Sequence, residues 1–204
     1  MNNNHNKKDK ILEAAIQVFA QHGYERGTVS EIANAAGIAK GSFYHYFSSK
    51  EEIIYDLFDL FFEQFIMNWE QIIDKNISPV RKIKLLIDQT FEDLIQMQKE
   101  KDLTKMILIF EIMFLLFRKS LKDKSENNIE QLFLRYYDIL VPLFKEGQEK
   151  GIFRSDIDPE YAAYLIFGMI DGFSLHFIIQ KDNYDIKESK KYLIDLILNG
   201  LVNK

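Results

Sequence analysis

The segment that decides the fold is residues 28–47, which read TVSEIANAAGIAKGSFYHYF. Thr28 is followed three residues later by Glu31, the pattern of a capping box that starts a helix. That helix is expected to end at Gly37, and a second short helix is expected from about Lys40 to Phe47. Two short helices joined by a tight turn are the plan of a helix-turn-helix, whose second helix enters the major groove of DNA.

The second helix of this segment carries side chains suited to DNA. A cation stands at its tip, a glycine permits close approach, and short donors and aromatic rings suit phosphates and thymine methyls. The next helix, from about residue 48, starts with a lysine whose charge suits a phosphate, although a solvated helix start is the alternative. Phe43 and Phe47 are expected to face inward, and Tyr44 and Tyr46 have core packing as their alternative. The predicted DNA contacts are Thr28, Lys40, Gly41, Ser42, Tyr44, His45 and Lys50.

Helix signals continue through the chain of 204 residues, and strand signals are scarce. Helix stops are expected at Gly23 and Gly151, and caps followed by proline at Ser78-Pro79 and Asp158-Pro159. Residues 119–128 are polar and are expected to form a loop. The prediction is an all-α protein of nine helices, three short and six longer. We expect a DNA-binding domain over residues 1–50 and a sensing and dimerisation domain over 51–204, with no flexible linker.

Residues 8–53 resemble the DNA-binding domain of the TetR family of bacterial transcriptional regulators. The resemblance rests first on ILEAA at 11–15, with Phe19 and with GY at 23–24, and on Thr28-x-x-Glu-Ile-Ala. It rests also on AGIAKGS at 36–42, FYHYF at 43–47 and SKEE at 49–52. The order and spacing of these elements match throughout. The resemblance implies an all-helical homodimer with a three-helix DNA-binding domain and a larger ligand-sensing domain. It also implies DNA contact at the seven residues predicted above.

The remainder of the chain is rich in phenylalanine, with 14 of the 17 Phe residues after residue 50. Such density favours either a core of bulky side chains or an aromatic cavity for an apolar ligand. Two acids stand out because buried carboxylates are costly unless paired. Glu111 lies in an apolar helix, where it would pair with a base such as Arg135, face water or meet a polar ligand head. The predicted ligand contacts are Phe62, Phe65, Trp69, Phe91, Phe110, Glu111, Phe114, Tyr137, Phe167 and Asp171.

The last two helices are the predicted dimer interface. Gly168 and Gly172 share one helix face, which permits close approach of a partner helix or of a neighbouring helix in the same chain. The resemblance implies that such helices pair with their copies as a four-helix bundle. The candidates are Leu165, Phe173, His176, Phe177, Leu193, Leu196, Ile197 and Leu201.

Charge divides the chain unevenly. The net charge is -5, but residues 1–50 hold six basic and four acidic side chains, a net of +2, so the remainder carries -7. A small basic module on an acidic body favours a DNA-binding tip.

The predicted function is that of a DNA-binding regulator, a repressor released from a palindromic operator by an apolar or amphipathic small molecule. The alternative is a DNA-binding protein of the same fold that acts in chromosome organisation or cell division without an effector. An enzyme is not expected, because the chain has no cysteine and its four histidines are scattered. We likewise expect no cofactor, no metal and no membrane partner, and a cytoplasmic location because the first residues lack a signal peptide.

Overall fold

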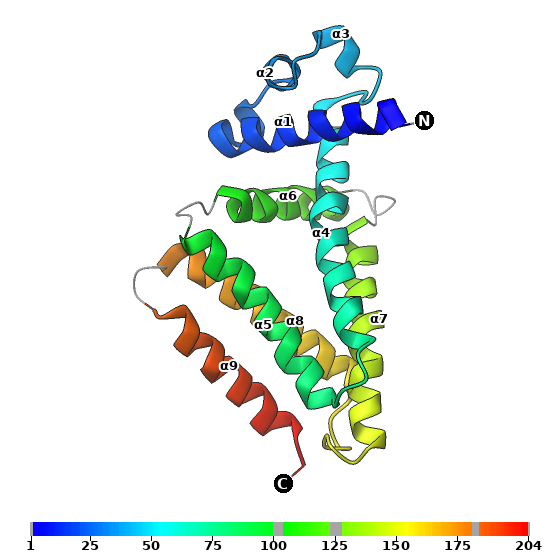
Figure 1. Cartoon of the computed structure of the whole chain (residues 1–204), viewed down its shortest axis with the longest axis vertical. Coiled ribbons are helices and arrows are strands. Elements are labelled where there is room, and N and C mark those ends of the chain that lie inside the picture. Colours follow the sequence, from blue (N-terminus) through cyan, green and yellow to red (C-terminus); the bar gives the residue numbers. More distant parts are fainter. Residues whose placement is uncertain (1, 100–103, 123–127, 181–183, 204) are drawn as a thin grey trace. The chain divides into compact units, whose positions relative to one another are not determined.

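The computed structural model describes residues 2–99, 104–122, 128–180 and 184–203, and within these ranges the chain is all-helical (Figure 1). The helices are α1 (Asn2–Arg26), α2 (Val29–Ala35), α3 (Lys40–Phe43), α4 (Lys50–Ile73), α5 (Pro79–Lys99), α6 (Thr104–Lys122), α7 (Asn128–Glu149), α8 (Pro159–Gln180) and α9 (Ile186–Leu201). The described residues therefore form nine helices, as the sequence predicts, but only α2 and α3 are short, because α1 spans 25 residues.

Helix starts follow the capping residues. The Thr28 hydroxyl accepts the Glu31 N–H at 3.2 Å, and the Glu31 carboxylate accepts the Thr28 N–H at 2.8 Å. These two bonds confirm the capping box of α2. At the start of α9, the Asp185 carboxylate accepts the Glu188 N–H at 2.8 Å. Each bond satisfies a backbone donor that a helix start would otherwise leave without a partner.

Three predicted boundaries differ from the structure. α1 continues past the expected stop at Gly23 to Arg26, although Gly23 itself is non-helical with φ of +75°. The second helix of the helix-turn-helix is a single α-helical turn, Lys40–Phe43, and residues 44–46 continue it as turns instead of helix. The predicted loop at 119–128 is also too long, because α6 extends to Lys122 and α7 already begins at Asn128. The part of that loop at 123–127 lies outside the described residues.

The chain divides into two compact units. The first contains residues 1–64 and 103–129, which include α1 to α3, the first part of α4, and α6. Its α1 packs against α2 and α6, and α2 packs against α3. Fully buried apolar side chains hold this unit together: Ile11, Ala15, Ile32, Phe43, Ile53, Leu57 and Ile112.

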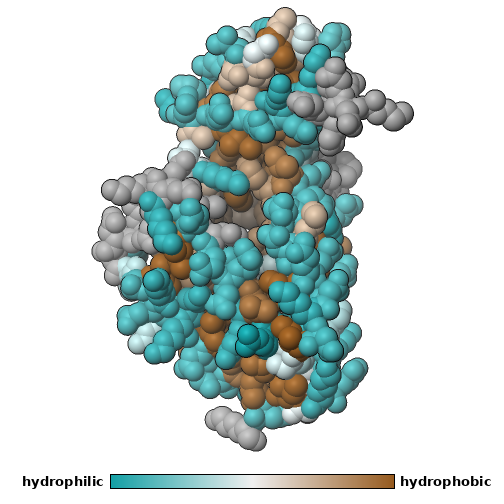
Figure 2. All heavy atoms as spheres, viewed as in Figure 1, coloured by the Kyte–Doolittle hydropathy of each residue, from teal (hydrophilic) through white to brown (hydrophobic). Residues whose placement is uncertain are grey.

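The second unit contains residues 65–102 and 130–204, with the remainder of α4, and α5 and α7 to α9. Its α5 packs against α9, and Lys190 of α9 reaches the Asp88 carboxylate of α5 at 2.9 Å. Apolar side chains also lie exposed between hydrophilic ones on the face drawn in Figure 2, so burial within this chain does not account for all of them.

The end of α7 requires a glycine. A Cβ atom at Gly147 would lie 2.0 Å from Cδ2 of Phe153, whose ring is buried, so the helix and the ring approach closely. Gly41 provides a contrast, because a Cβ there would meet nothing within 4 Å.

We therefore predict that Gly147→Ala lowers the free energy of unfolding by about 1–3 kcal/mol, because the buried ring has to shift. Gly41→Ala should leave it unchanged or raise it slightly, since alanine favours a helix. Urea denaturation followed by circular dichroism measures both, and equal stabilities would contradict the close approach.

Candidate functional site

The tight turn of the helix-turn-helix is set by Gly37. Its φ of +67° is a left-handed conformation that glycine adopts at little cost. The turn lets the Ile38 N–H donate to the Ala33 carbonyl at 2.9 Å, which closes the end of α2. This geometry turns the chain sharply from α2 into α3.

The packing of α3 determines which side chains it exposes. Phe43 and Phe47 are buried, with ring centroids 5.7 Å apart, as the sequence predicts. Lys40, Gly41, Tyr44 and His45 are exposed at this tip, and Ser42 is half-buried. The structure thus brings most of the predicted DNA contacts together on one exposed tip, while the contacts themselves stay predictions.

Thr28 is exposed, but its hydroxyl already forms hydrogen bonds within the chain. Its hydroxyl donates to the Glu31 carboxylate at 2.7 Å as well as accepting from the Glu31 N–H. These hydrogen bonds lower the pKa of Glu31 and keep its carboxylate ionised. The hydroxyl of Thr28 therefore caps α2, and a phosphate contact at this position stays a prediction.

Lys50 has a role that the sequence did not reveal. Its Nζ donates to the carbonyl oxygens of Tyr24 at 2.7 Å, Glu25 at 3.2 Å and Gly27 at 3.1 Å. The same atom lies 4.3 Å from the centroid of the Tyr24 ring. An ammonium group has three N–H donors, so all three serve the end of α1, and the predicted phosphate contact would have to displace one of them.

Glu111 has a structural role in this unit, and its role as a ligand contact stays a prediction. Its Oε1 accepts the Tyr24 N–H at 3.1 Å, just after Gly23, whose φ of +75° interrupts α1. Neither Arg135 nor a ligand is needed to account for its position in an apolar helix, because a backbone donor at the end of α1 uses the carboxylate. Arg118 of α6 lies 3.9 Å from the carboxylate of Glu25.

Together these bonds define the α1 clamp, which consists of Lys50 from α4 and Glu111 from α6 holding residues 24–27. The clamp lies immediately before Thr28, so it fixes where the helix-turn-helix begins. Gly27 fits tightly here, because a Cβ would lie 2.7 Å from the Phe19 ring.

A second candidate site is the aromatic cluster of the second unit. We define it as Phe65, Trp69, Phe133, Tyr136 and Phe167. The Trp69 ring lies 4.9 Å from Phe65 and 5.5 Å from Tyr136, and the Tyr136 ring lies 4.4 Å from Phe167. Three of the predicted ligand contacts, Phe65, Trp69 and Phe167, therefore come together.

Asp171 borders this cluster, four residues after Phe167 on α8. Burial raises the pKa of its carboxyl to about 6. Burial first, and then the Asp171 charge, raise the pKa of the Tyr136 hydroxyl well above its usual value. Tyr136 was missed by the sequence analysis, which chose the adjacent Tyr137; the latter is half-buried, with its ring 6.5 Å from Tyr164.

The other predicted ligand contacts lie elsewhere. Phe91 is fully buried and stacks on Phe173 at 4.7 Å, so both belong to the packing of α5 on α8. Phe62 pairs with Phe58 at 4.5 Å, and Phe62, Phe110 and Phe114 belong to the first unit, not to the aromatic cluster.

The predicted dimer residues divide into two groups. Phe177, Ile197 and Leu201 are buried within the chain, so little of their surface is left for an interface, and their dimer role stays a prediction. Leu193 and Phe173 are half-buried, whereas Leu165, His176 and Leu196 are exposed. The exposed apolar residues of α8 and α9 include several that the sequence analysis missed: Tyr161, Tyr164, Met169, Ile179 and Tyr192. Gly168, Gly172 and Gly200 lie in open space on these helices.

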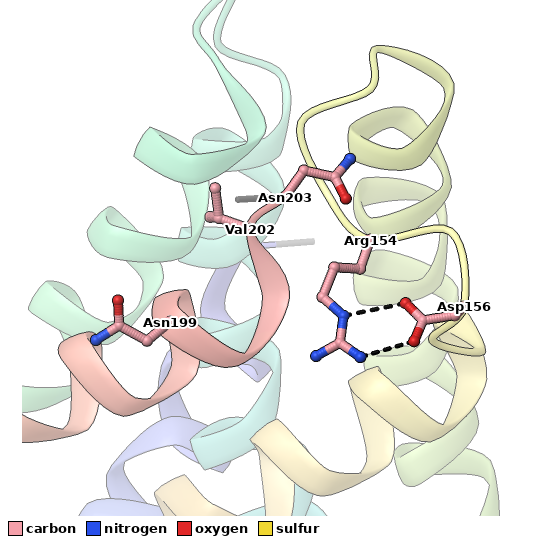
Figure 3. Close-up of a pocket in the computed structure, with 5 residues that line it drawn as sticks. All are labelled: Arg154, Asp156, Asn199, Val202 and Asn203. Atoms are coloured by element: carbon pink, nitrogen blue, oxygen red, sulfur yellow. Dashed lines mark hydrogen bonds and ion pairs between the residues drawn. The ribbon is translucent and has the colours of Figure 1, made fainter.

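A polar hollow of about 400 Å³ lies at the end of α9 (Figure 3), lined by Arg154, Asp156, Asn199, Val202 and Asn203. Arg154 points across it to the Asp156 carboxylate, with Nε and Nη2 at 3.0 and 2.7 Å. Asn203 donates to the carbonyls of Gly151 and Phe153. The bonds of Asn203 hold it against residues 151–153, in the loop after α7.

Other kinds of site have no support in the described ranges. No group of three or more His, Cys, Asp or Glu lies where it could hold a metal ion in this part of the chain. Among the same residues, no helix is both long and apolar enough to cross a membrane.

A helix-turn-helix with an exposed tip, followed by a larger helical region, defines the class of helical DNA-binding regulators. Comparison with known proteins gives the family. Residues 11–57 match "Bacterial regulatory proteins, tetR family", and residues 58–200 match "YsiA-like protein, C-terminal region". The chain belongs to the TetR family and carries a YsiA-like C-terminal region; it is a DNA-binding transcriptional regulator, from a family of regulators and not of enzymes.

Individual relatives agree with this assignment. The "Fatty acid metabolism regulator protein" of Bacillus subtilis is 29% identical over 195 residues, which cover 96% of this chain and 95% of that protein. The "HTH-type transcriptional repressor KstR2" of Mycobacterium tuberculosis is 28% identical, covering 74% of this chain and 72% of its own. Among solved structures, FadR of B. subtilis in complex with stearoyl-CoA superposes with a TM-score of 0.72 at 27% identity, covering 94% of this chain and 97% of FadR.

We predict that Lys50→Met lowers the free energy of unfolding by about 1–3 kcal/mol, because three carbonyls at the end of α1 lose a charged donor. Lys40→Met, at the exposed tip of α3, should leave stability unchanged. Both variants should bind DNA more weakly. The Lys50 variant no longer holds the end of α1 in place, and the Lys40 variant lacks a positive charge at the DNA-facing tip. Urea denaturation separates them, and an unchanged stability of the Lys50 variant would show that this lysine does not hold α1.

Proposed function

We propose that this chain is a homodimeric repressor that a long-chain acyl-CoA releases from its operator. The observation that carries the proposal is the YsiA-like match over residues 58–200, the sensing half of the chain. It is supported by 29% identity to a fatty acid metabolism regulator along nearly the whole chain and by similarity to FadR, whose structure contains stearoyl-CoA. The aromatic cluster supplies apolar surface suited to an acyl chain.

In this proposal DNA binding and effector binding are assigned to the two regions that the sequence predicts. Residues 1–50 carry the exposed α3 tip and read DNA, whereas residues 51–204 bind the effector and form the dimer. Two tips on one dimer read half-sites about 34 Å apart, one turn of DNA. An effector that binds better to a dimer with another tip spacing lowers DNA affinity through a population shift. Such a repressor acts where bacterial DNA lies, in the cytoplasm.

The release can be measured on a duplex selected by this protein from random-sequence DNA. Stearoyl-CoA should weaken binding to the selected duplex by about 5–150-fold, the usual range of allosteric coupling. Fluorescence anisotropy of the labelled duplex gives the affinity, and free coenzyme A is the control. An affinity that no acyl-CoA of any chain length changes would contradict the proposal.

The dimer is proposed to form through the exposed apolar face of α8 and α9. Its residues recur at helical spacing along α8, from Tyr161 through Leu165 and Met169 to Ile179, and α9 adds Tyr192 and Leu196. Gly168 and Gly172 lie on α8 where a Cβ would meet nothing, so a partner helix has room to approach.

We predict that Leu165→Glu combined with Leu196→Glu converts the dimer to a 24.1 kDa monomer, because two charges enter an apolar interface. Ile197 is left intact because it is buried in the chain. Leu134→Glu, at an exposed leucine of α7, is the matched control and should stay dimeric. Sedimentation velocity measures the oligomeric state of each variant. A double variant that is still dimeric would contradict this interface.

A further inference from the structure

Trp69 is the single tryptophan of the chain and carries an unusual buried donor. Its side chain is fully buried, and its Nε1–H has no acceptor among the described residues. An indole nitrogen only donates, so this group gains nothing from the aromatic rings of Phe65 and Tyr136 around it beyond weak contact. A buried donor without an acceptor destabilises the fold, so an acceptor atom of a ligand would relieve this cost.

Asp171 is a second polar group of this region without a partner in the described part of the chain. It is half-buried, and no hydrogen bond or ion pair joins its carboxyl to another described residue. Even with its pKa raised to about 6, most molecules carry the charge at pH 7. A partly buried anion without a cation is costly and repels any second anion brought near it.

Tyr136 connects the two groups. Its ring packs 5.5 Å from Trp69 and 4.4 Å from Phe167, and its hydroxyl feels the charge of Asp171. The cluster is not sealed, because Phe65, Phe133 and Asp171 are only half-buried. An apolar chain that enters between these rings would reach the Trp69 ring, which carries the unused donor, and Tyr136, whose hydroxyl is affected by the Asp171 charge.

Building on the proposed function, we propose that Trp69 and Asp171 select the polar group of the effector: Trp69 donates to a neutral oxygen on an apolar chain, and Asp171 excludes a carboxylate. The neutral oxygen is a carbonyl or a hydroxyl, as found in a thioester, an ester or an alcohol. A free fatty acid carries the same chain but ends in an anion. The pair thus distinguishes an activated acyl chain from the free acid.

The test uses the full-length protein and the fluorescence of Trp69, which is unambiguous because no other tryptophan is present. Lauroyl-CoA, methyl laurate, 1-dodecanol and lauric acid are titrated separately. The first three should shift Trp69 emission and bind, whereas lauric acid should bind about tenfold more weakly or not at all. The ester and the alcohol separate recognition of the neutral oxygen from recognition of the coenzyme A portion.

Two substitutions test the residues themselves. Asp171→Asn keeps the shape and removes the charge, so it should raise affinity for lauric acid by about tenfold. Trp69→Phe keeps a ring and removes the donor, so it should weaken lauroyl-CoA binding by about tenfold, measured by calorimetry. Asp138→Asn, at an exposed acid of α7, is the matched control. Circular dichroism checks folding, and Asp171→Asn should melt no lower than the wild type because it removes an unpaired charge.

The outcomes separate this inference from the proposed function. If acyl-CoA releases the operator but neither Trp69 emission nor the two substitutions alter selectivity, the inference is wrong and the proposed function stands. If the neutral ligands bind the cluster and Asp171→Asn admits lauric acid, while no acyl-CoA releases DNA, the inference stands and the proposed effector is wrong. If Asp171→Asn unfolds the protein, Asp171 is structural and the inference is overturned.

Discussion

The arrangement of the DNA-binding unit depends on how the end of α1 is held. A helix end leaves carbonyl oxygens without partners, and here the ammonium group of Lys50 binds three carbonyls of residues 24–27. The carboxylate of Glu111, which is negative where Lys50 is positive, accepts a hydrogen bond from the Tyr24 N–H. Because α2 begins at Val29, two residues beyond this clamp, the position of the helix-turn-helix follows from it. α4 and α6 thereby reach the DNA-binding helices through charged groups, and not through apolar packing alone.

The local signals in the sequence were sufficient for the helices and for the tip of α3. The Thr28 capping box and the left-handed Gly37 act over three or four residues, so the short-range pattern contains the whole cause. Spacing likewise placed Phe43 and Phe47 inside, which leaves Lys40 and Tyr44 exposed. The family could be identified from these same residues, and the match over residues 11–57 confirms it.

The sequence did not reveal contacts between distant residues, nor which of two adjacent helical positions faces the core. Glu111 and Tyr24 are 87 residues apart, and no periodicity shows that they meet. Tyr136 and Tyr137 differ by one position, which rotates a side chain by about 100° around the helix axis, and only Tyr136 lies in the aromatic cluster. α8 is apolar on most sides, so its pattern did not separate the buried Phe177 from the exposed Leu165. On α9 the adjacent Leu196 and Ile197 likewise divide into exposed and buried.

Operator and effector are proposed to compete for one dimer. Native mass spectrometry of the full-length protein, mixed with its selected duplex and stearoyl-CoA, counts each complex directly. The account predicts a dimer bound to duplex without acyl-CoA and a dimer bound to acyl-CoA without duplex, with few complexes holding both. If duplex and acyl-CoA bound independently, a ternary complex of dimer, duplex and acyl-CoA would be abundant. Finding it at that abundance would contradict the proposed competition.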